Sequence, residues 1–221
     1  LHSGARYVSN DPHSARECRD ENRLLKQLAP DCIEDTGGFF AAVEGDDEKF
    51  VADFPLLCET HGLPCRAVDV ADAREMEPAL SEKTIAVYEV EDASVDPFKL
   101  VLENITDAQK LGARFFRHTR VTGFRKENNR IISVELQHRQ TGEKTTVEAD
   151  MVVNATGAWA AEVARLAGAP ISVLYSKGTL AITHTRITGR VVNRLRPPAD
   201  ADILVPGGTV SIIGTTSVRM K

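Results

Sequence analysis

The sequence predicts a mixed α/β protein, with both α/β and α+β character, and three observations lead to this fold class. A short apolar run at residues 151–153 passes through a turn of small residues into a helical pattern. Before it, residues 121–149 have the alternating pattern of a β-meander. After it, short strand-like runs separated by Gly and Pro continue to the end of the chain, as is typical of antiparallel sheet.

Helical and strand patterns alternate through the first part of the chain. Asp11 and Pro12 are typical of a helix start, because Asp11 can cap the helix and Pro12 has the φ angle of a first turn. An apolar stripe of Ala15, Cys18, Leu25 and Leu28 follows, and Pro30 ends the helix. Strands are expected at residues 39–43, 65–68 and 85–90, and further helices at residues 46–61 and 71–77, although Pro55 interrupts the first of these.

The clearest local signal predicts a helix over residues 96–112. Asp96 caps it, Pro97 opens its first turn and Gly112 closes it. One side is apolar, with Phe98, Val101, Leu102, Ile105 and Leu111. Because strand patterns flank the helix at residues 85–90 and 113–116, the sequence predicts a βαβ-like unit.

Three strands are predicted at residues 121–126, 131–137 and 144–149. The pairs Asn128-Asn129 and Thr141-Gly142 are plausible turns between them. Ile132, Val134 and Leu136 alternate with polar residues, so one face of this meander is expected to be buried and the other exposed to water.

The rest of the chain is organised around residues 150–168, DMVVNATGAWAAEVARLAG. The apolar run is typical of a strand buried on both faces, and Gly168 suits the end of the following helix. A turn at the carboxyl end of such a strand is where doubly wound sheets bind nucleotides, since Gly157 allows close approach and the helix N-terminus favours an anion. The alternative is a tight turn in which Gly157 serves packing.

The C-terminal part is expected to form antiparallel strands at residues 173–175, 179–183, 203–205 and 210–213. Cations surround these strands: Lys177, Arg186, Arg190, Arg194, Arg196 and Arg219. Either they face an anionic ligand or they are solvated loop cations.

Composition narrows the class of protein. With 221 residues, 42% apolar residues, 27% charged residues and a net charge of −5, the chain has ordinary globular composition, and we expect no nucleic-acid partner. No window has 18 uninterrupted apolar residues. The four cysteines lack a Cys-x-x-Cys pair and are expected to be reduced and mostly buried, and the scattered histidines predict no metal site. The chain starts without Met and ends just after a strand-like run, as expected of an internal fragment.

Six motifs in order resemble one family, the FAD-dependent glycerol-3-phosphate dehydrogenases, and most closely the A subunit of the anaerobic enzyme. They are LHSGARY (1–7), SVDPFKL (94–100), VNATGAW (within residues 152–159), Lys177-Gly178, ADILVPG (201–207) and IGTTS (213–217). VNATGAW alone is typical of the wider D-amino-acid oxidase-like flavoprotein superfamily.

The resemblance implies a partial FAD/NAD(P)-binding Rossmann-like domain with the β-meander, and an antiparallel-sheet substrate domain. Residues 1–40 and 113–170 would belong to the FAD-binding domain, and residues 41–112 and 171–221 to the substrate, or cap, domain. The family's Gly-x-Gly-x-x-Gly unit is not found in this sequence, so the fragment is expected to lack the main pyrophosphate clamp and to be inactive by itself.

The implied reaction of glycerol metabolism is oxidation of sn-glycerol 3-phosphate to dihydroxyacetone phosphate, with hydride transfer to FAD and electrons passed to a quinone-linked acceptor. Carried over residue by residue, the cofactor would be bound by His2, Ser3, Gly4, Val121, Ala155, Thr156, Gly157 and Trp159. The substrate would be bound by Arg6, Tyr7, Thr215 and Thr216, since a guanidinium suits a phosphate dianion. No catalytic base is identified.

The resemblance also implies other subunits of a membrane-associated complex and a cytoplasmic location, peripheral at the inner face of the cell membrane. Alternatives remain open. Arg6 and Tyr7 fit a surface loop and residues 214–216 a strand-end turn. The enzyme could be another flavin oxidase or dehydrogenase acting on an amine or a 2-hydroxy acid, whose carboxylate Arg6 would also bind. A non-catalytic cap or docking module is a further alternative.

Overall fold

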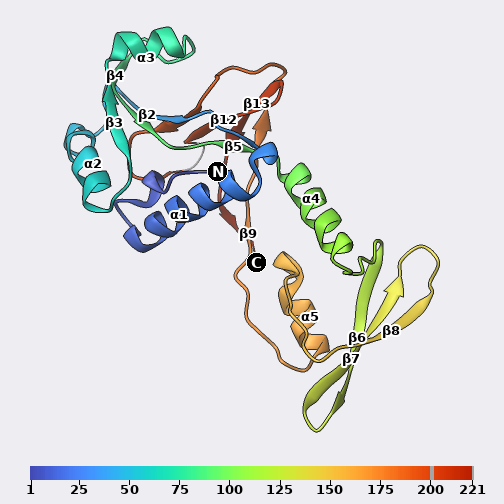
Figure 1. The fold of residues 1–221 in the computed structure, drawn as a ribbon. Helices are drawn as coiled ribbons and strands as arrows, with labels where there is room; N and C mark the ends of the chain where they lie inside the picture. Colours follow the sequence, from blue (N-terminus) through green and yellow to red (C-terminus); the bar gives the residue numbers. More distant parts are fainter. Residues whose placement is uncertain (200–201, 221) are drawn as a thin grey trace. The chain divides into compact units, whose positions relative to one another are not determined.

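The computed structural model describes residues 1–199 and 202–220, which fall into two compact units. The first contains residues 1–104 and 178–218, and the second is built mainly from residues 105–177 (Figure 1). These units group neighbouring residues and do not test the division into cofactor and substrate domains, which stays a prediction. Ala201, which opens the motif ADILVPG, and Lys221 lie outside the described residues.

Within the described residues, the first unit contains a sheet of seven strands in the order β10-β13-β12-β11-β2-β4-β3. Their bounds are β2 Gly38–Val43, β3 Cys65–Val68, β4 Thr84–Val90, β10 Ala181–Ile182, β11 Val191–Arg194, β12 Ile203–Gly207 and β13 Val210–Gly214. Neighbouring strands are antiparallel, except that β11 runs parallel to β2. The strands predicted at residues 39–43, 65–68, 85–90, 203–205 and 210–213 are confirmed.

The C-terminal strands β10, β12 and β13 pair in antiparallel fashion, as the sequence predicts, and they belong to the same sheet as strands of the N-terminal half. The unpredicted strand β11 pairs with β2 in the register Val191 to Gly38, and so joins the C-terminal strands to those of the N-terminal half. The physical reason is the central strand itself. Phe39, Phe40, Ala41 and Ala42 of β2 are all buried, so β2 needs a bonded neighbour along each edge as well as cover on each face.

Helices cover both faces of β2. Phe40 and Ala42 pack with Ala15 of α1 (Pro12–Leu28) and Phe54 of α2 (Glu48–Thr60). The alternate residues Phe39 and Ala41 pack instead with Ala73 of α3 (Val70–Met76). This alternation follows the two-residue period of a strand.

The helix starts follow from local chemistry. Asp11 accepts the N–H of Ser14 at 3.1 Å, and Asp47 and Asp69 cap α2 and α3 in the same way. The predicted stripe of α1 stops short of Leu28, which is 71% exposed. Short elements complete the unit: the 3-10 turns η1 (Ala5–Tyr7) and η2 (Pro30–Cys32), and the strand pair β1 (Ile33–Glu34) and β5 (Ser94–Val95).

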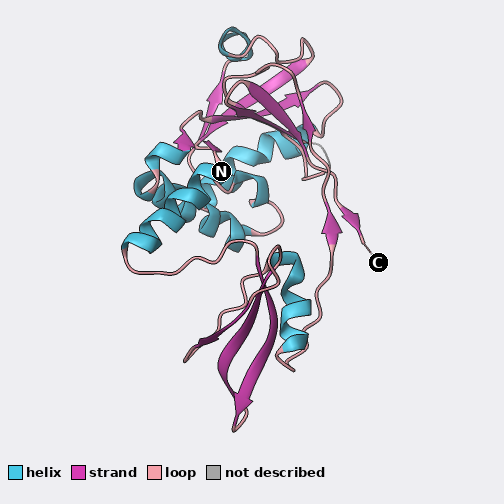
Figure 2. Ribbon diagram, turned by 90° about the vertical axis from the view of Figure 1, so that its right-hand side faces the viewer, coloured by secondary structure: helices cyan, strands magenta, loops and turns pink. Residues whose placement is uncertain are grey.

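The second unit contains the predicted meander, with β6 (Thr119–Glu127), β7 (Arg130–His138) and β8 (Lys144–Glu148) antiparallel in sequence order. Figure 2 shows these strands in magenta with α5 (Ala160–Leu166) alongside. Asn128 and Asn129 have φ angles of 49° and 63°, which suits a two-residue hairpin turn. Gly168 has a φ of 64° just beyond α5, as predicted. β9 (Ser176–Lys177) pairs with β14 (Val218–Arg219).

The helix predicted over residues 96–112 is confirmed as α4 (Pro97–Lys110), with the Asp96 carboxylate accepting the N–H groups of Phe98 and Lys99 at 3.0 Å. Its apolar side is exposed, with Phe98 80% and Leu111 90% accessible. The predicted strands at residues 113–116, 151–153 and 173–175 are wrong, and with them the βαβ-like unit. Met151 and Val153 are 82% and 80% exposed. No described strand pairs with these three runs. Tyr175 accepts the N–H of Met220 at 2.9 Å, but a single backbone hydrogen bond does not make a strand ladder.

All four cysteines lie within the described residues, and none forms a disulfide there. Cys32 and Cys58 are buried, and Cys18 and Cys65 are half-buried.

Candidate functional site

The N-terminal segment, residues 2–7, lies against α1 in a conformation that requires glycine. Gly4 has a φ of 97°, in the left-handed region, and a Cβ there would overlap the carbonyl oxygen of Ala15 and lie 2.8 Å from its carbonyl carbon. Ser3 is 1% exposed and donates its N–H and its hydroxyl to Asp92 Oδ1, at 2.6 and 2.8 Å. The segment is therefore a fixed structure, not a surface loop.

The His2 imidazole is held in one orientation. Its Nδ1 accepts the N–H of Gly4 at 3.2 Å, and its ring meets the Tyr7 ring edge-on with centroids 5.2 Å apart. Burial lowers the pKa of His2 below its ordinary value, and the nearby Asp92 carboxylate offsets part of this effect. At neutral pH the ring is therefore neutral. Since Nδ1 accepts, Nε2 carries the proton and can donate it to a ligand.

The sequence left open whether the C-terminal arginines bind an anionic ligand or are solvated. Four of them are paired with carboxylates. Arg186 meets Glu34 at 2.6 and 3.0 Å, and Arg194 meets both oxygens of Asp46 at 2.7 and 2.8 Å. Two further pairs are Arg190 with Glu89 at 3.3 Å, and Arg196 with Asp202 at 3.0 Å. Each of these four arginines therefore has a carboxylate partner within the protein and needs no anionic ligand. Lys177 and Arg219, by contrast, lie exposed in β9 and β14.

Arg6 differs from them. Its Nη2 donates to the carbonyl oxygen of Ala199 at 3.1 Å, and among the described residues it forms no ion pair. No carboxylate of the described chain offsets its guanidinium, and most of its N–H donors are available to an anion.

Thr215 and Thr216 follow β13 and pack against residues 178–179. Thr216 Oγ1 accepts the N–H of Thr179 at 3.1 Å, and a Cβ on Gly178 would lie 2.6 Å from Thr215 Oγ1. In the described chain no hydrogen bond joins these threonines to Arg6 or Tyr7. The structure thus places the four predicted substrate residues in the first unit without joining them in one hydrogen-bonded cluster.

In the second unit the structure brings predicted cofactor residues together. Val121 of β6, Thr156 and Trp159 line one cavity of about 500 Å³. The hydroxyl of Thr156 donates to Asn154 Oδ1 at 2.7 Å, while Asn154 Nδ2 donates to the carbonyl oxygen of Ala160 at 2.9 Å. The turn is thereby tied to the start of α5.

Gly157 faces open space. It has a φ of 57°, and no heavy atom lies within 4 Å of the position of a Cβ. Ala155, Thr156 and Gly157 are exposed, so the backbone there is accessible. A packing role for Gly157 therefore has no support, although its φ angle favours glycine without any ligand. The helix after this turn is short, with seven residues in α5 after the 3-10 turn η3 (Gly157–Trp159).

Sequence reasoning missed two arginines of this cavity. Arg120 and Arg139 line it together with Val121 and Trp159, and Arg120 is paired with Glu162 at 2.5 Å. The position of Arg120 beside Val121 on a predicted strand was a signal, but the approach of Arg139 depends on how β6 and β7 pair. The walls of this cavity are apolar, aromatic and charged, and the Glu162 carboxylate offsets the charge of Arg120.

The comparison with known families decides which cofactor class applies. The model of the DAO family, described as FAD dependent oxidoreductase, matches residues 1–220. The chain belongs to this family. The predicted fold class is confirmed.

Curated relatives match over the whole chain. The A subunit of the anaerobic glycerol-3-phosphate dehydrogenase of Escherichia coli (strain K12) is 44% identical over 220 residues, which are 100% of this chain and 41% of that protein. The A1 subunit of the same enzyme from Haloferax volcanii is 40% identical, over 100% of this chain and 39% of that protein. The chain thus spans about two fifths of the length of these relatives.

Solved structures share the fold. L-proline dehydrogenase from P. horikoshii aligns with a TM-score of 0.78 at 23% identity, over 100% of this chain and 58% of that one. The glycerol-3-phosphate dehydrogenase from Bacillus halodurans, solved with FAD, aligns with a TM-score of 0.66 at 19% identity, over 99% of this chain and 41% of that one. At these identities the likeness concerns the fold alone.

Metal-binding clusters and membrane-spanning helices are both absent from the described residues. They contain no group of three His, Cys, Asp or Glu side chains placed to hold a metal ion. Within the same residues, no helix has the length and apolar character needed to cross a membrane.

Proposed function

We propose that this chain is part of an FAD-dependent dehydrogenase that oxidises sn-glycerol 3-phosphate to dihydroxyacetone phosphate. The observation that carries the proposal is the 44% identity, over the whole chain, to a relative named as the A subunit of an anaerobic glycerol-3-phosphate dehydrogenase. When bound, FAD supplies the hydride acceptor, and the protein supplies orientation and charge.

The residues divide into three roles in this proposal. His2, Ser3 and Gly4 face the flavin, with the Nε2–H of His2 as a donor toward it. The backbone of residues 155–157 lies along the cofactor, and Val121 and Trp159 enclose its adenosine end. Arg6, with Tyr7, Thr215 and Thr216, binds the substrate. The unpaired guanidinium of Arg6 supports its role, since a phosphate dianion is the strongest acceptor on this substrate.

We further propose that the electrons pass to a quinone-linked acceptor through partner subunits. In this view the protein is cytoplasmic and lies peripherally at the inner face of the cell membrane through one of those subunits. The support is that the relatives are named as subunits of a larger enzyme.

A second candidate is a flavin enzyme acting on an amine or a 2-hydroxy acid. L-proline dehydrogenase and glycine oxidase from Geobacillus kaustophilus, the latter with a TM-score of 0.75 at 21% identity, share this fold, so the fold by itself does not exclude this alternative. The carboxylate of such a substrate would bind Arg6 as well. A non-catalytic docking module is a third candidate, which flavin reduction by any of these substrates would exclude.

Arg6→Ala in the full-length enzyme tests whether Arg6 binds the phosphate of the proposed substrate. A charge-assisted hydrogen bond is worth about 1.5–3 kcal/mol, so kcat/KM for glycerol 3-phosphate should fall about ten- to a hundredfold at unchanged FAD content. Glycerol lacks the phosphate and should be affected much less. The matched control is Arg16→Ala, because Arg16 contacts His61 Nδ1 at 3.3 Å and, in the described chain, has no carboxylate partner either.

Steady-state kinetics with both substrates and a flavin spectrum of each variant are the measurements. If Arg6→Ala slows glycerol and glycerol 3-phosphate equally, or removes the flavin, Arg6 does not bind the phosphate. Equal losses in the Arg6 and Arg16 variants would also contradict its role.

A further inference from the structure

Asp92 is a buried carboxylate without a cationic partner. It lies just after β4, is 1% exposed, and forms no ion pair among the residues that the structure describes. Its Oδ1 accepts the N–H and the hydroxyl of Ser3, and its Oδ2 accepts Nδ2 of Asn193 in β11 at 3.0 Å. Three hydrogen bonds thus take the place of a counter-ion, which is a costly arrangement for a charge with no other role.

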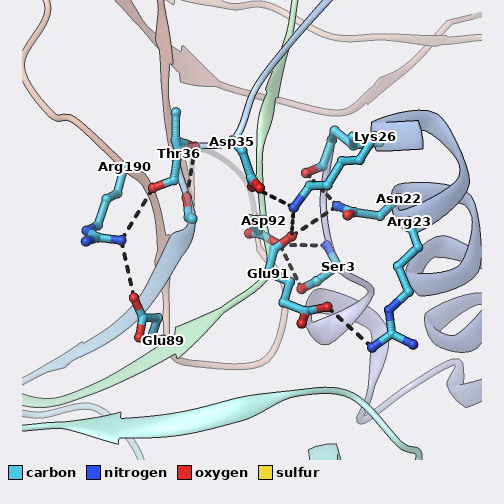
Figure 3. Close-up of polar contacts among 12 residues, drawn as sticks. Ser3, Asn22, Arg23, Lys26, Asp35, Thr36, Glu89, Glu91, Asp92 and Arg190 are labelled. Atoms are coloured by element: carbon cyan, nitrogen blue, oxygen red, sulfur yellow. Dashed lines mark hydrogen bonds and ion pairs between the residues drawn. The ribbon is translucent and has the colours of Figure 1, made fainter. Parts of the chain in front are cut away.

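The segment is also held at Leu1, which precedes His2, by residues next to Asp92. The carbonyl oxygen of Leu1 accepts the N–H of Ala93 at 2.8 Å and Nδ2 of Asn22 at 3.4 Å. Asn22 also donates to the carbonyl oxygen of Glu91 at 3.1 Å. Figure 3 shows Ser3, Asn22, Glu91 and Asp92 converging from α1, the N-terminal segment and the end of β4. His2 therefore lies between two residues that are both bound to residues 91–93.

Asp92 has little room to move. A Cβ on Gly38 of β2 would lie 2.6 Å from Asp92 Cβ, so the carboxylate is packed against the backbone of the central strand. On the far side of Ser3, Gly4 is packed against Ala15 with equally little room. The central sheet therefore fixes Asp92, and Asp92 fixes Ser3.

The contact between Asp92 and Ser3 also determines the orientation of the His2 ring. With Ser3 fixed, the N–H of Gly4 is fixed, and it is this N–H that His2 Nδ1 accepts. The ring orientation and the direction of Nε2–H follow from that hydrogen bond. We propose that Asp92, assisted by Asn193, is the positioning residue that holds Ser3 and thereby sets the His2 ring toward the flavin. This inference rests on the proposed function in one respect, the placement of residues 2–4 beside the cofactor.

The test is Asp92→Asn in the full-length, FAD-loaded enzyme. The new amide can still present its oxygen to Ser3, but its NH2 group then meets Nδ2 of Asn193, donor against donor. The segment should shift, so that kcat per bound flavin falls about tenfold or more, because small displacements near reacting atoms are that costly. The visible circular dichroism of the bound flavin, which reads its surroundings without any substrate, should change as well.

A second substitution should rescue the first. In Asp92→Asn with Asn193→Asp, the new carboxylate accepts the NH2 of residue 92, and every hydrogen bond has a donor and an acceptor again. Both kcat and the flavin signal should return to within about threefold of the unaltered enzyme, as expected of strongly coupled positions. Failure of the rescue would overturn the positioning role, because the charge at residue 92 itself would then matter.

Glu77→Gln is the matched control. Glu77 is also a buried carboxylate of the first unit, 4% exposed, and accepts the N–H of Gly189 at 3.0 Å, but it has no contact with residues 1–7. This variant should lower the melting temperature without changing kcat per flavin or the flavin signal. If Asp92→Asn behaves like it, Asp92 is merely structural and the inference is wrong.

Ser3→Ala keeps the test decisive if Asp92→Asn does not fold. It removes the hydroxyl contact and retains the N–H contact to Asp92, so smaller changes of the same kind are expected. An unchanged flavin signal in this variant would overturn the inference. Failure of the unaltered enzyme to oxidise glycerol 3-phosphate would reject the proposed function instead, and the flavin signals would still test Asp92.

Discussion

Gly4→Ala tests the fixed conformation of the N-terminal segment, and the chain offers a matched control. Gly4 and Gly45 have φ angles of 97° and 89°, so both substitutions force alanine into the left-handed region. Their surroundings differ. A Cβ on Gly4 would overlap the carbonyl of Ala15, whereas no heavy atom lies within 4 Å of a Cβ on Gly45.

The magnitudes follow from that difference. The left-handed conformation costs alanine about 1–2 kcal/mol at either position. Overpacking against a backbone atom, which cannot rotate away as a side chain can, adds about 1–3 kcal/mol at Gly4. The two variants should therefore differ in free energy of unfolding by the overpacking contribution, with Gly4→Ala the less stable.

Thermal unfolding of the full-length enzyme, followed by circular dichroism, measures the difference. Because Gly4→Ala is the less stable variant, it should melt below Gly45→Ala. Equal melting temperatures would show that the segment is free to move away from α1, and would remove the basis for a fixed His2.

Two further predictions concern the second unit and an ion pair of the first. Gly157→Val in the full-length enzyme should lower the FAD occupancy strongly and the melting temperature only slightly, because the β-branched side chain would enter the space of the cofactor. The matched control is Gly142→Val, since Gly142 lies in a meander turn with a similar φ of 74° and equally open surroundings. This control variant should keep its FAD. Normal flavin content in a less stable Gly157→Val variant would contradict this. Burial raises the pKa of Asp46, but hydrogen bonds from the N–H of Val43 and from Arg194 outweigh it and lower the pKa below its ordinary 3.8. The unfolded chain therefore binds the proton more readily, so this stabilisation is present above pH 3.8 and is lost as pH falls through the folded pKa. The free energy of unfolding of Asp46→Asn should therefore fall less with decreasing pH than that of the unaltered enzyme. The same pH dependence in both proteins would contradict the assignment.

The elements that the sequence predicts correctly are those determined locally. Asp11 and Asp96 cap helices through contacts two or three residues away, and Asn128-Asn129 closes a hairpin by its own backbone preference. Residues 151–153 look like a strand by composition, yet a strand also needs a hydrogen-bonded neighbour, which composition cannot show. Strand β11 was missed for the converse reason, since its pairing with β2 joins residues about 150 apart.

The candidate site divides in the same way. The turn at Gly157 and the segment at Gly4 can be recognised as sequence motifs. The structure adds that the backbone at Gly157 is accessible and that Gly4 is packed against Ala15. The role of Arg194 was not visible, because its partner Asp46 lies 148 residues away. Asp92 stands among the acidic residues Glu91 and Asp96, and the fold alone distinguishes it as the one that is buried and bound to Ser3.

The most direct test of the central claim is anaerobic reduction of the bound flavin in the full-length enzyme. We predict that glycerol 3-phosphate bleaches the flavin absorbance within the turnover time, and that L-proline, glycine and 2-hydroxy acids do not. Bleaching by one of those carboxylates without bleaching by glycerol 3-phosphate would contradict the proposed substrate, and a full-length protein that binds no flavin would contradict the account as a whole.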